Sequence, residues 1–307
     1  MLDNLLSRGL ALVERALRVP WIVEARSVVA ADAEAGGSLL AAALAYRALF
    51  GLLSELVFAA GLVGWLIEDP ARRADAMATL ATLLPGVEPV ARSGLDSLVA
   101  GHGAVSTLGL LGAAWSASAF YDALDAAVNR VLPGSRARSA FERRLRGIGA
   151  VVVLALAGSL ALGMGLALPA LQGLVGGEPL RLLVAAGEAG LTVALLWAGV
   201  LTIYRFVPTA VPSLSAAGLP ALAVGCGIWL TAQAYALLVP LLVGGLAVFG
   251  IFVSLLGLLI WFGWVSQLLL LGASWTRVRR DGSRALTPGA TRSDGRSGPM
   301  PTGAGRS

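Results

Sequence analysis

Two charged side chains lie inside an apolar run of this 307-residue chain: Arg47 and Glu55 both fall within residues 39–67. A run of ~20 apolar residues crosses a bilayer as a helix, and a charge near the bilayer centre costs roughly 2.5–3.5 kcal/mol. The two residues are separated by about 80° around a helix and ~12 Å along it. They are too far apart for a mutual salt bridge, so each needs water, the membrane interface or a second helix.

Each of these two charges has two interpretations. Arg47 either reaches back to the cytoplasmic interface with its long side chain or belongs to a polar site. Glu55 is too deep to reach the interface. It is therefore either a neutral, hydrogen-bonded structural residue or a group in a water-filled cavity that exchanges protons.

A second polar set follows the next apolar run, where Asp122, Asp125 and Asn129 share one helical stripe. Carboxylates at i and i+3 repel each other, so water or an arginine must compensate them. The stripe is interpreted either as the mouth of a cavity or as a solvated helix end. Consecutive spans run antiparallel, and Arg47 is therefore expected to meet Asp122 or Asp125. With two further polar residues near span ends, the candidate cavity residues are Tyr46, Arg47, Glu55, Asp122, Asp125, Asn129 and Arg205.

The composition predicts a membrane protein and gives no sign of an enzyme. Hydrophobic residues make up 57% of the chain and charged residues 13%, with a mean hydropathy of +0.80. One cysteine, Cys226, excludes an internal disulfide, and one histidine, His102, excludes histidine-rich metal chemistry. The sequence has no phosphate loop, zinc-binding spacing or Ser-His-Asp set. We therefore expect no cofactor, no metal site and no nucleic-acid partner.

The fold expected is all-α, with six transmembrane helices. The apolar spans are residues 39–67, 104–124, 148–175, 182–204, 217–243 and 248–275. With an intracellular N-terminus, eighteen arginines fall in inside segments and four in outside loops. This positive-inside bias predicts a multi-pass membrane protein with both termini in the cytoplasm.

Three regions follow from this pattern. Residues 1–38 are expected to form a cytoplasmic segment whose first 20 residues make an amphipathic helix. Residues 39–276 form the six-helix membrane domain. Residues 277–307, rich in Gly, Ser, Pro and Arg, are expected to be a disordered cytoplasmic tail, and the outside connection 68–103 to form short interfacial helices.

Several segments resemble the YihY/BrkB family of bacterial inner-membrane proteins. Residues 39–50 are similar to its first-span signature, residues 115–130 to its second, residues 204–208 to its Tyr-Arg-x-x-Pro segment, and Trp261 with residues 269–273 to its last span. Two positions depart from the family pattern. Ser54-Glu55 stands where a proline is usual, and Ser274 stands where an acidic residue is frequent. The resemblance implies six helices, both ends cytoplasmic, envelope integrity and movement of lipid-like molecules. An older label in the family, a tRNA-processing ribonuclease, finds no support in these residues.

Two functions therefore remain open. The first is a transporter or exporter of a lipid-like amphiphile, and the alternative is a non-transporting scaffold or envelope factor that binds a partner. Membrane lipids are the expected partners, and the oligomeric state is left open, with a homo-oligomer among the alternatives. A groove lined by Arg47, Glu55, Asp122 and Asp125 would favour transport, whereas a tightly packed core would favour a scaffold.

Overall fold

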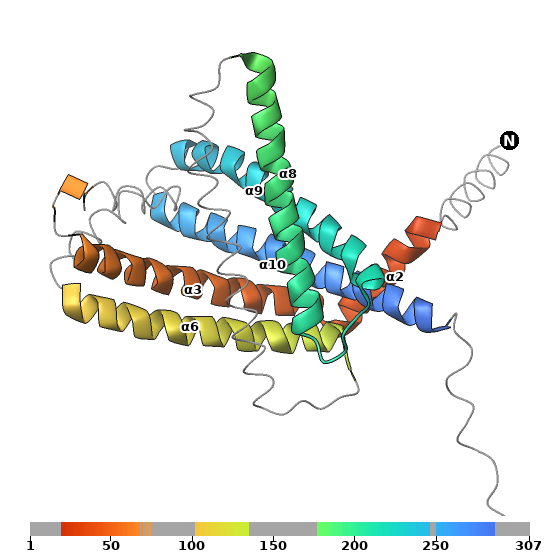
Figure 1. Cartoon of the computed structure of the whole chain (residues 1–307). Helices are drawn as coiled ribbons and strands as arrows, with labels where there is room; N and C mark the ends of the chain where they lie inside the picture. Colours follow the sequence, from red (N-terminus) through yellow and green to blue (C-terminus); the bar gives the residue numbers. More distant parts are fainter. Residues whose placement is uncertain are drawn as a thin grey trace, which may run out of the picture.

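The computed structural model describes residues 20–67, 69, 71–72, 74, 102–134, 177–245 and 250–285, and it contains no strand in these ranges (Figure 1). The described part therefore agrees with the all-α class predicted from the sequence. Its helices are α2 (Pro20–Ala35), α3 (Gly37–Leu66), α6 (His102–Val131), α8 (Glu178–Phe206), α9 (Leu214–Gly245) and α10 (Gly250–Ala285).

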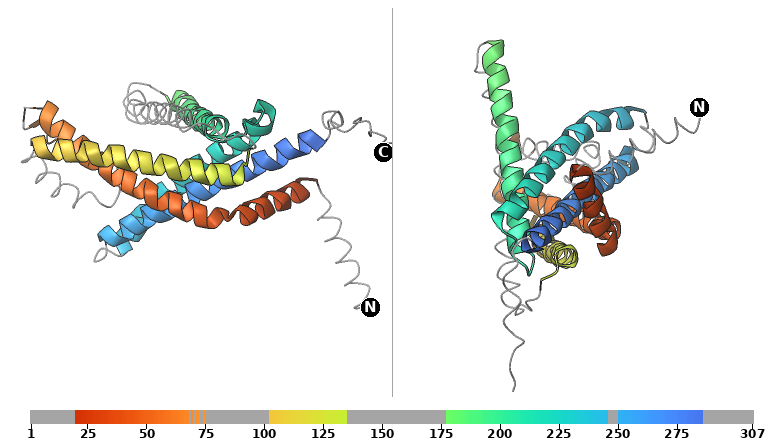
Figure 2. Two further views of the ribbon diagram at one scale, coloured as in Figure 1. Left: turned by 90° about the horizontal axis from the view of Figure 1, so that it is seen from below. Right: turned by 90° about the vertical axis from the view of Figure 1, so that its right-hand side faces the viewer.

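The helices pack as a bundle from which one member splays. Helices α3 and α6 lie side by side and antiparallel, and α10 packs against α3 and α9 (Figure 1). Helix α8 packs mainly on α9, and its N-terminal end stands away from the other helices in both Figure 1 and Figure 2. The C-terminal end of α8 rejoins the bundle.

One end of the bundle holds most of the core. The start of α3, the ends of α6, α8 and α10, and the start of α9 meet there, and we call this region the packed end. Its largest fully buried side chains include Leu44, Leu124, Leu132, Tyr204 and Leu270. Large apolar side chains outside it face away from the protein, among them Leu182 and Leu183 on α8 at 70% and 68% exposure. This distribution is typical of helices surrounded by lipid.

A sharp break separates α2 from α3. Gly36 adopts φ +73°, in the left-handed region that favours glycine, and the two helices meet at 67°. At the next position, a Cβ on Gly37 would collide with the carboxylate of Asp32. The first glycine therefore supplies the turn, and the second supplies the space that brings α2 close to the start of α3.

The described helices account for part of the predicted membrane domain. Three are long and apolar enough to cross a bilayer, at Pro179–Phe206, Leu214–Leu238 and Leu255–Gly282, and the bent α2–α3 pair would add a fourth. They correspond to the fourth, fifth, sixth and first predicted spans, and α6 covers the second. The third span, the helix expected at 1–20 and most of the connection at 68–103 lie outside the described residues.

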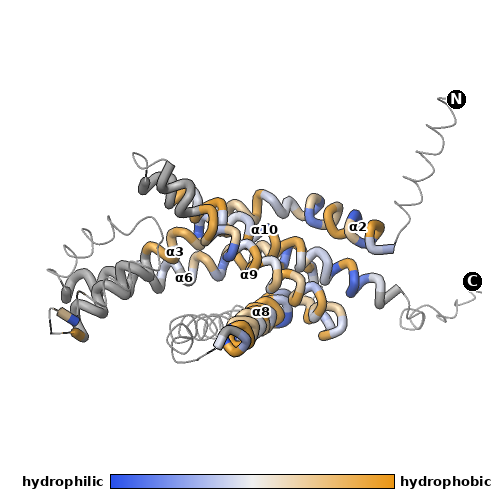
Figure 3. Tube along the Cα trace, turned by 90° about the horizontal axis from the view of Figure 1, so that it is seen from above, coloured by the Kyte–Doolittle hydropathy of each residue, from blue (hydrophilic) through white to orange (hydrophobic). Residues whose placement is uncertain are grey.

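Two predicted boundaries differ from the structure. Residues 20–35, expected as part of a cytoplasmic segment, form α2, which packs on α10. Helix α10 continues to Ala285, nine residues beyond the predicted limit of the membrane domain. The helix is held there by contacts of its arginines: Arg277 pairs with Glu34 at 3.5 Å, and Nη1 of Arg280 donates to the Pro133 carbonyl at 3.3 Å. Figure 3 shows hydrophilic residues in α2 and in the last turns of α10, where these contacts form.

Candidate functional site

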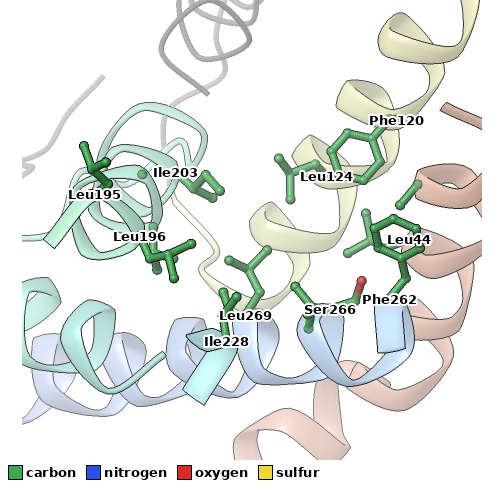
Figure 4. Close-up of a pocket in the computed structure, with 14 residues that line it drawn as sticks. Leu44, Phe120, Leu124, Leu195, Leu196, Ile203, Ile228, Phe262, Ser266 and Leu269 are labelled. Carbon is green, nitrogen blue, oxygen red and sulfur yellow. The ribbon is translucent and has the colours of Figure 1, made fainter. Parts of the chain in front are cut away.

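An apolar cavity of about 320 Å³ lies where α3, α6, α8, α9 and α10 converge (Figure 4). Among the residues that the structure describes, its wall is hydrophobic except for one hydroxyl-bearing residue, Ser266 on α10. The lining residues are Leu44, Ala48, Phe120, Leu124, Leu195, Leu196, Gly199, Val200, Ile203, Ile228, Phe262, Val265, Ser266 and Leu269. Ligand pockets in proteins span about 300–1,000 Å³, so the cavity is large enough for a ligand group.

The splay of α8 explains why the cavity exists. Helix α8 diverges from α6 and α3 along its length, and two small lining residues, Ala48 on α3 and Gly199 on α8, leave space between them. Leucine side chains from three helices border that space in Figure 4, including Leu44, Leu124 and Leu196. The resulting site can hold a hydrocarbon chain, and it offers little to a polar solute.

A buried hydrogen bond holds α8 against α10 where they border the cavity, at the packed end. The hydroxyl of Tyr204, which is fully buried, donates to the carbonyl of Leu269 at 2.6 Å. Leu269 and the neighbouring Ile203 both line the cavity. The bond therefore sets the distance between α8 and α10 where they border this space. Tyr204 and Leu269 both lie in segments that resemble the family, but the sequence did not predict that they are hydrogen-bonded to each other.

The six candidate residues whose side chains the structure describes do not line this cavity. Arg47 is exposed, and its Nη1 donates to the carbonyl of Ala119 on α6 at 2.5 Å. The expected ion pair between Arg47 and Asp122 does not form in the described structure. Asp122 is exposed on α6, one turn beyond Ala119. Antiparallel packing of α3 and α6 was expected, but the rotation of each helix about its axis turns both side chains away from the interior of the bundle.

Asp125 and Asn129 join α6 to the segment after α8. Nδ2 of Asn129 donates to the backbone oxygen and to Oδ1 of Asp125, at 2.8 and 2.9 Å. Its Oδ1 accepts a hydrogen bond from the backbone N–H of Thr209 at 2.7 Å. Gly134 also lies against Thr209, where a Cβ would be too close. In this structure, these two members of the predicted stripe anchor the α8–α9 connection to the end of α6.

The remaining candidates are placed as follows. Tyr46 is exposed on α3 and its ring lies 4.8 Å from that of Phe50, centroid to centroid. Arg205 is half-buried in the last turn of α8. Glu55 falls within α3, but its side chain lies outside the described part of the structure. Tyr46 and Arg205 therefore add no wall to the cavity.

Sequence analysis missed a second polar cluster, centred on Asp32 of α2. This carboxylate is buried, and it accepts hydrogen bonds from Gln267 Nε2 at 2.8 Å and from Ser274 Oγ at 3.4 Å. Nearby, Trp275 Nε1 donates to Glu24 at 2.6 Å. Ser274 is one of the departures from the family pattern, and the structure gives it a role as a donor to an acid on another helix.

The described helices and their apolar cavity define an all-α membrane protein. No group of three His, Cys, Asp or Glu residues that could hold a metal ion occurs in the described ranges. The chain belongs to the family Virulence factor BrkB, which it matches over residues 31–294. This confirms the resemblance identified from the sequence segments. No curated protein and no solved structure matches the chain.

Proposed function

We propose that this protein binds membrane amphiphiles by inserting their hydrocarbon portion into the cavity between α3, α6, α8, α9 and α10, and moves them between the leaflets of the inner membrane. The observation that carries the proposal is the apolar wall of that cavity, in which Ser266 has the only polar side chain among the described lining residues. The proposal includes no catalytic step, no cofactor and no nucleic acid.

The physical basis for selection is shape rather than hydrophobicity. Lipid tails in a bilayer are as apolar as leucine, so a hydrocarbon chain gains little from leaving lipid for a leucine-lined wall. Binding must come from close packing against the wall and from contacts of the polar headgroup at the packed end. A cavity whose wall includes a splayed helix offers such packing without closing around the ligand.

The proposed orientation places the packed end in the cytoplasm. The arginine bias of the sequence favours this arrangement, with eighteen arginines in segments expected inside. The meeting of alternate helix ends at one side of the bundle is consistent with successive crossings of one membrane. Both termini are then cytoplasmic in this proposal.

The test is lipid transfer in liposomes that contain the purified full-length protein and a phospholipid with a fluorescent headgroup. Dithionite quenches only the outer leaflet, so continued quenching reports transfer. Ala48→Trp places a large side chain in the cavity, and we expect it to slow transfer at least tenfold. Ala223→Trp, on the exposed side of α9, is the matched control and should transfer like wild type. Equal transfer by Ala48→Trp and the control would contradict the proposal.

The scaffold alternative has one observation in its favour, the dense packing at the packed end, where Val128, Val131 and Leu132 have no exposed surface. A scaffold or envelope factor would bind a partner and would not move lipid. Wild-type protein that retains bound lipid through purification but gives no transfer above protein-free liposomes would support that alternative.

A further inference from the structure

The outer face of α3 and α6 carries aromatic and charged side chains that point away from the protein. We define the outer face by Tyr46, Arg47, Phe50, Trp115, Ser118 and Asp122, all of them exposed. Trp115 is 79% exposed and Tyr46 57%. Exposed aromatic rings can contact either lipid or a protein partner. A charged side chain in a membrane, by contrast, is stabilised by a polar or charged partner.

Both charges lie well away from the helix ends. Arg47 is ~15 Å along α3 from its first residue, and Asp122 is ~13 Å from the last residue of α6. The Arg47 side chain contacts the Ala119 carbonyl, and within the described structure the Asp122 side chain has neither a hydrogen bond nor an ion pair. A positive charge supplied by another molecule would pair with this carboxylate.

The two charges are neighbours on this face without touching. Arg47 reaches Ala119, and Asp122 is ~4.5 Å further along α6 and about 60° around it. Opposite charges placed side by side on one surface make that surface self-complementary, because a two-fold axis brings each charge of one copy to the opposite charge of the other. We propose that the outer face is a homodimer interface in which Arg47 of each chain pairs with Asp122 of the other.

A second copy fits this face better than an anionic lipid headgroup does. A headgroup phosphate would meet Arg47 favourably but would be repelled by Asp122. The dimer leaves the cavity accessible, because the cavity-lining Leu44 and Leu124 lie on the opposite sides of their helices from Tyr46 and Asp122. This inference is therefore independent of the proposed function.

Charge reversal on two separately tagged chains tests the pairing. Arg47→Asp gives a face with two acids, and Asp122→Arg gives a face with two bases. Each variant alone should lose dimer, by at least tenfold in the dimer-to-monomer ratio measured by light scattering in detergent. Co-expressed, the two variants should form a heterodimer that co-purifies through both tags, because only pairs between chains restore the opposite charges. Arg26→Asp, at an exposed position of α2, lowers the net charge by the same amount as Arg47→Asp and should dimerise like wild type.

Cysteine cross-linking tests the proposed interface if a charge-reversed chain fails to fold. In a Cys226→Ser background, Trp115→Cys on the outer face should cross-link to its copy in native membranes. Leu230→Cys, 59% exposed on α9, is the matched control and should stay monomeric. Wild-type protein that is monomeric, or cross-linking from Leu230→Cys but not from Trp115→Cys, would overturn the proposed interface.

Discussion

Single side chains at the packed end connect helices that are far apart in the sequence. Asp32 accepts hydrogen bonds from Gln267 and Ser274, 235 and 242 positions away, and both donors are neutral. Burial of a carboxylate is tolerable when its oxygens are hydrogen-bonded, and removing the acceptor leaves the donors unsatisfied. Asp32 therefore supplies the buried part of the contact between α2 and α10, beside the more exposed contacts of Glu24 and Glu34.

Replacement of Asp32 should destabilise the protein in proportion to the acceptors lost. We expect Asp32→Ala to lower the free energy of unfolding by about 1–3 kcal/mol, and Asp32→Asn by less because its amide oxygen still accepts a bond. Thermal unfolding of the full chain in detergent measures this. Glu34→Ala removes a carboxylate that is 72% exposed and should change stability by about 0.5 kcal/mol at most. If Asp32→Ala lowers the free energy of unfolding no more than Glu34→Ala does, the cluster around Asp32 contributes little to stability.

At the scale of whole elements, α8, α9 and α10 approach closely because small residues line their contact. A Cβ on Gly272 of α10 would collide with the Tyr204 hydroxyl on α8 and with Val224 on α9. Close approach at small residues is the usual way in which membrane helices gain packing contacts. The same approach brings the Tyr204 hydroxyl to the Leu269 carbonyl, and so it shapes one wall of the cavity.

A double-mutant cycle measures how these two features depend on each other. Gly272→Ala should cost about 1–3 kcal/mol by overpacking, and Tyr204→Phe about 1 kcal/mol through the lost hydrogen bond. The double variant should lose less than the sum, because phenylalanine lacks the hydroxyl that the new Cβ meets. Gly263→Ala, elsewhere on α10, adds a Cβ with no atom within 4 Å and serves as control. Strictly additive losses would mean that Gly272 is not needed for the approach of Tyr204.

The contacts of the last turns of α10 lead to a separate prediction about the tail. Truncation after Gly282 keeps Arg277 and Arg280, and it should leave membrane insertion and thermal stability nearly unchanged. Truncation after Thr276 removes the contacts with Glu34 and the Pro133 carbonyl, and the melting temperature should fall by several degrees. Equal stability of the two truncated chains would contradict a structural role for these turns.

For the molecule as a whole, the membrane class and the described helices followed from the sequence because long apolar runs have few other stable arrangements. The positions of charges relative to other helices did not follow. The pairing of Arg47 with Asp122 was predicted from antiparallel neighbours, yet a rotation of each helix decides whether such residues face each other or turn outward. Asp32 was missed because one acid before an apolar run carries no periodic signal. The cavity depends on the splay of α8, which no local pattern encodes.

Topology is the whole-molecule prediction that the arginine bias supports. Reporter fusions at Ser135 and in the tail after residue 285 should report the cytoplasm, and a fusion at Gly101 should report the outside. The orientation follows from eighteen arginines in inside segments against four in outside loops. A reporter at Gly101 that is active only in the cytoplasm would reverse the proposed orientation of the packed end.

The most direct test of the central claim is to locate bound hydrocarbon in the cavity. Full-length protein in liposomes is irradiated with a phospholipid that carries a photoactivatable group in its acyl chain, and cross-linked peptides are identified by mass spectrometry. We expect cross-links at cavity residues such as Leu124, Leu196 and Leu269, lost in Ala48→Trp and retained in Ala223→Trp. Cross-links confined to outward-facing residues such as Leu182 and Leu230, and unchanged by Ala48→Trp, would contradict the claim.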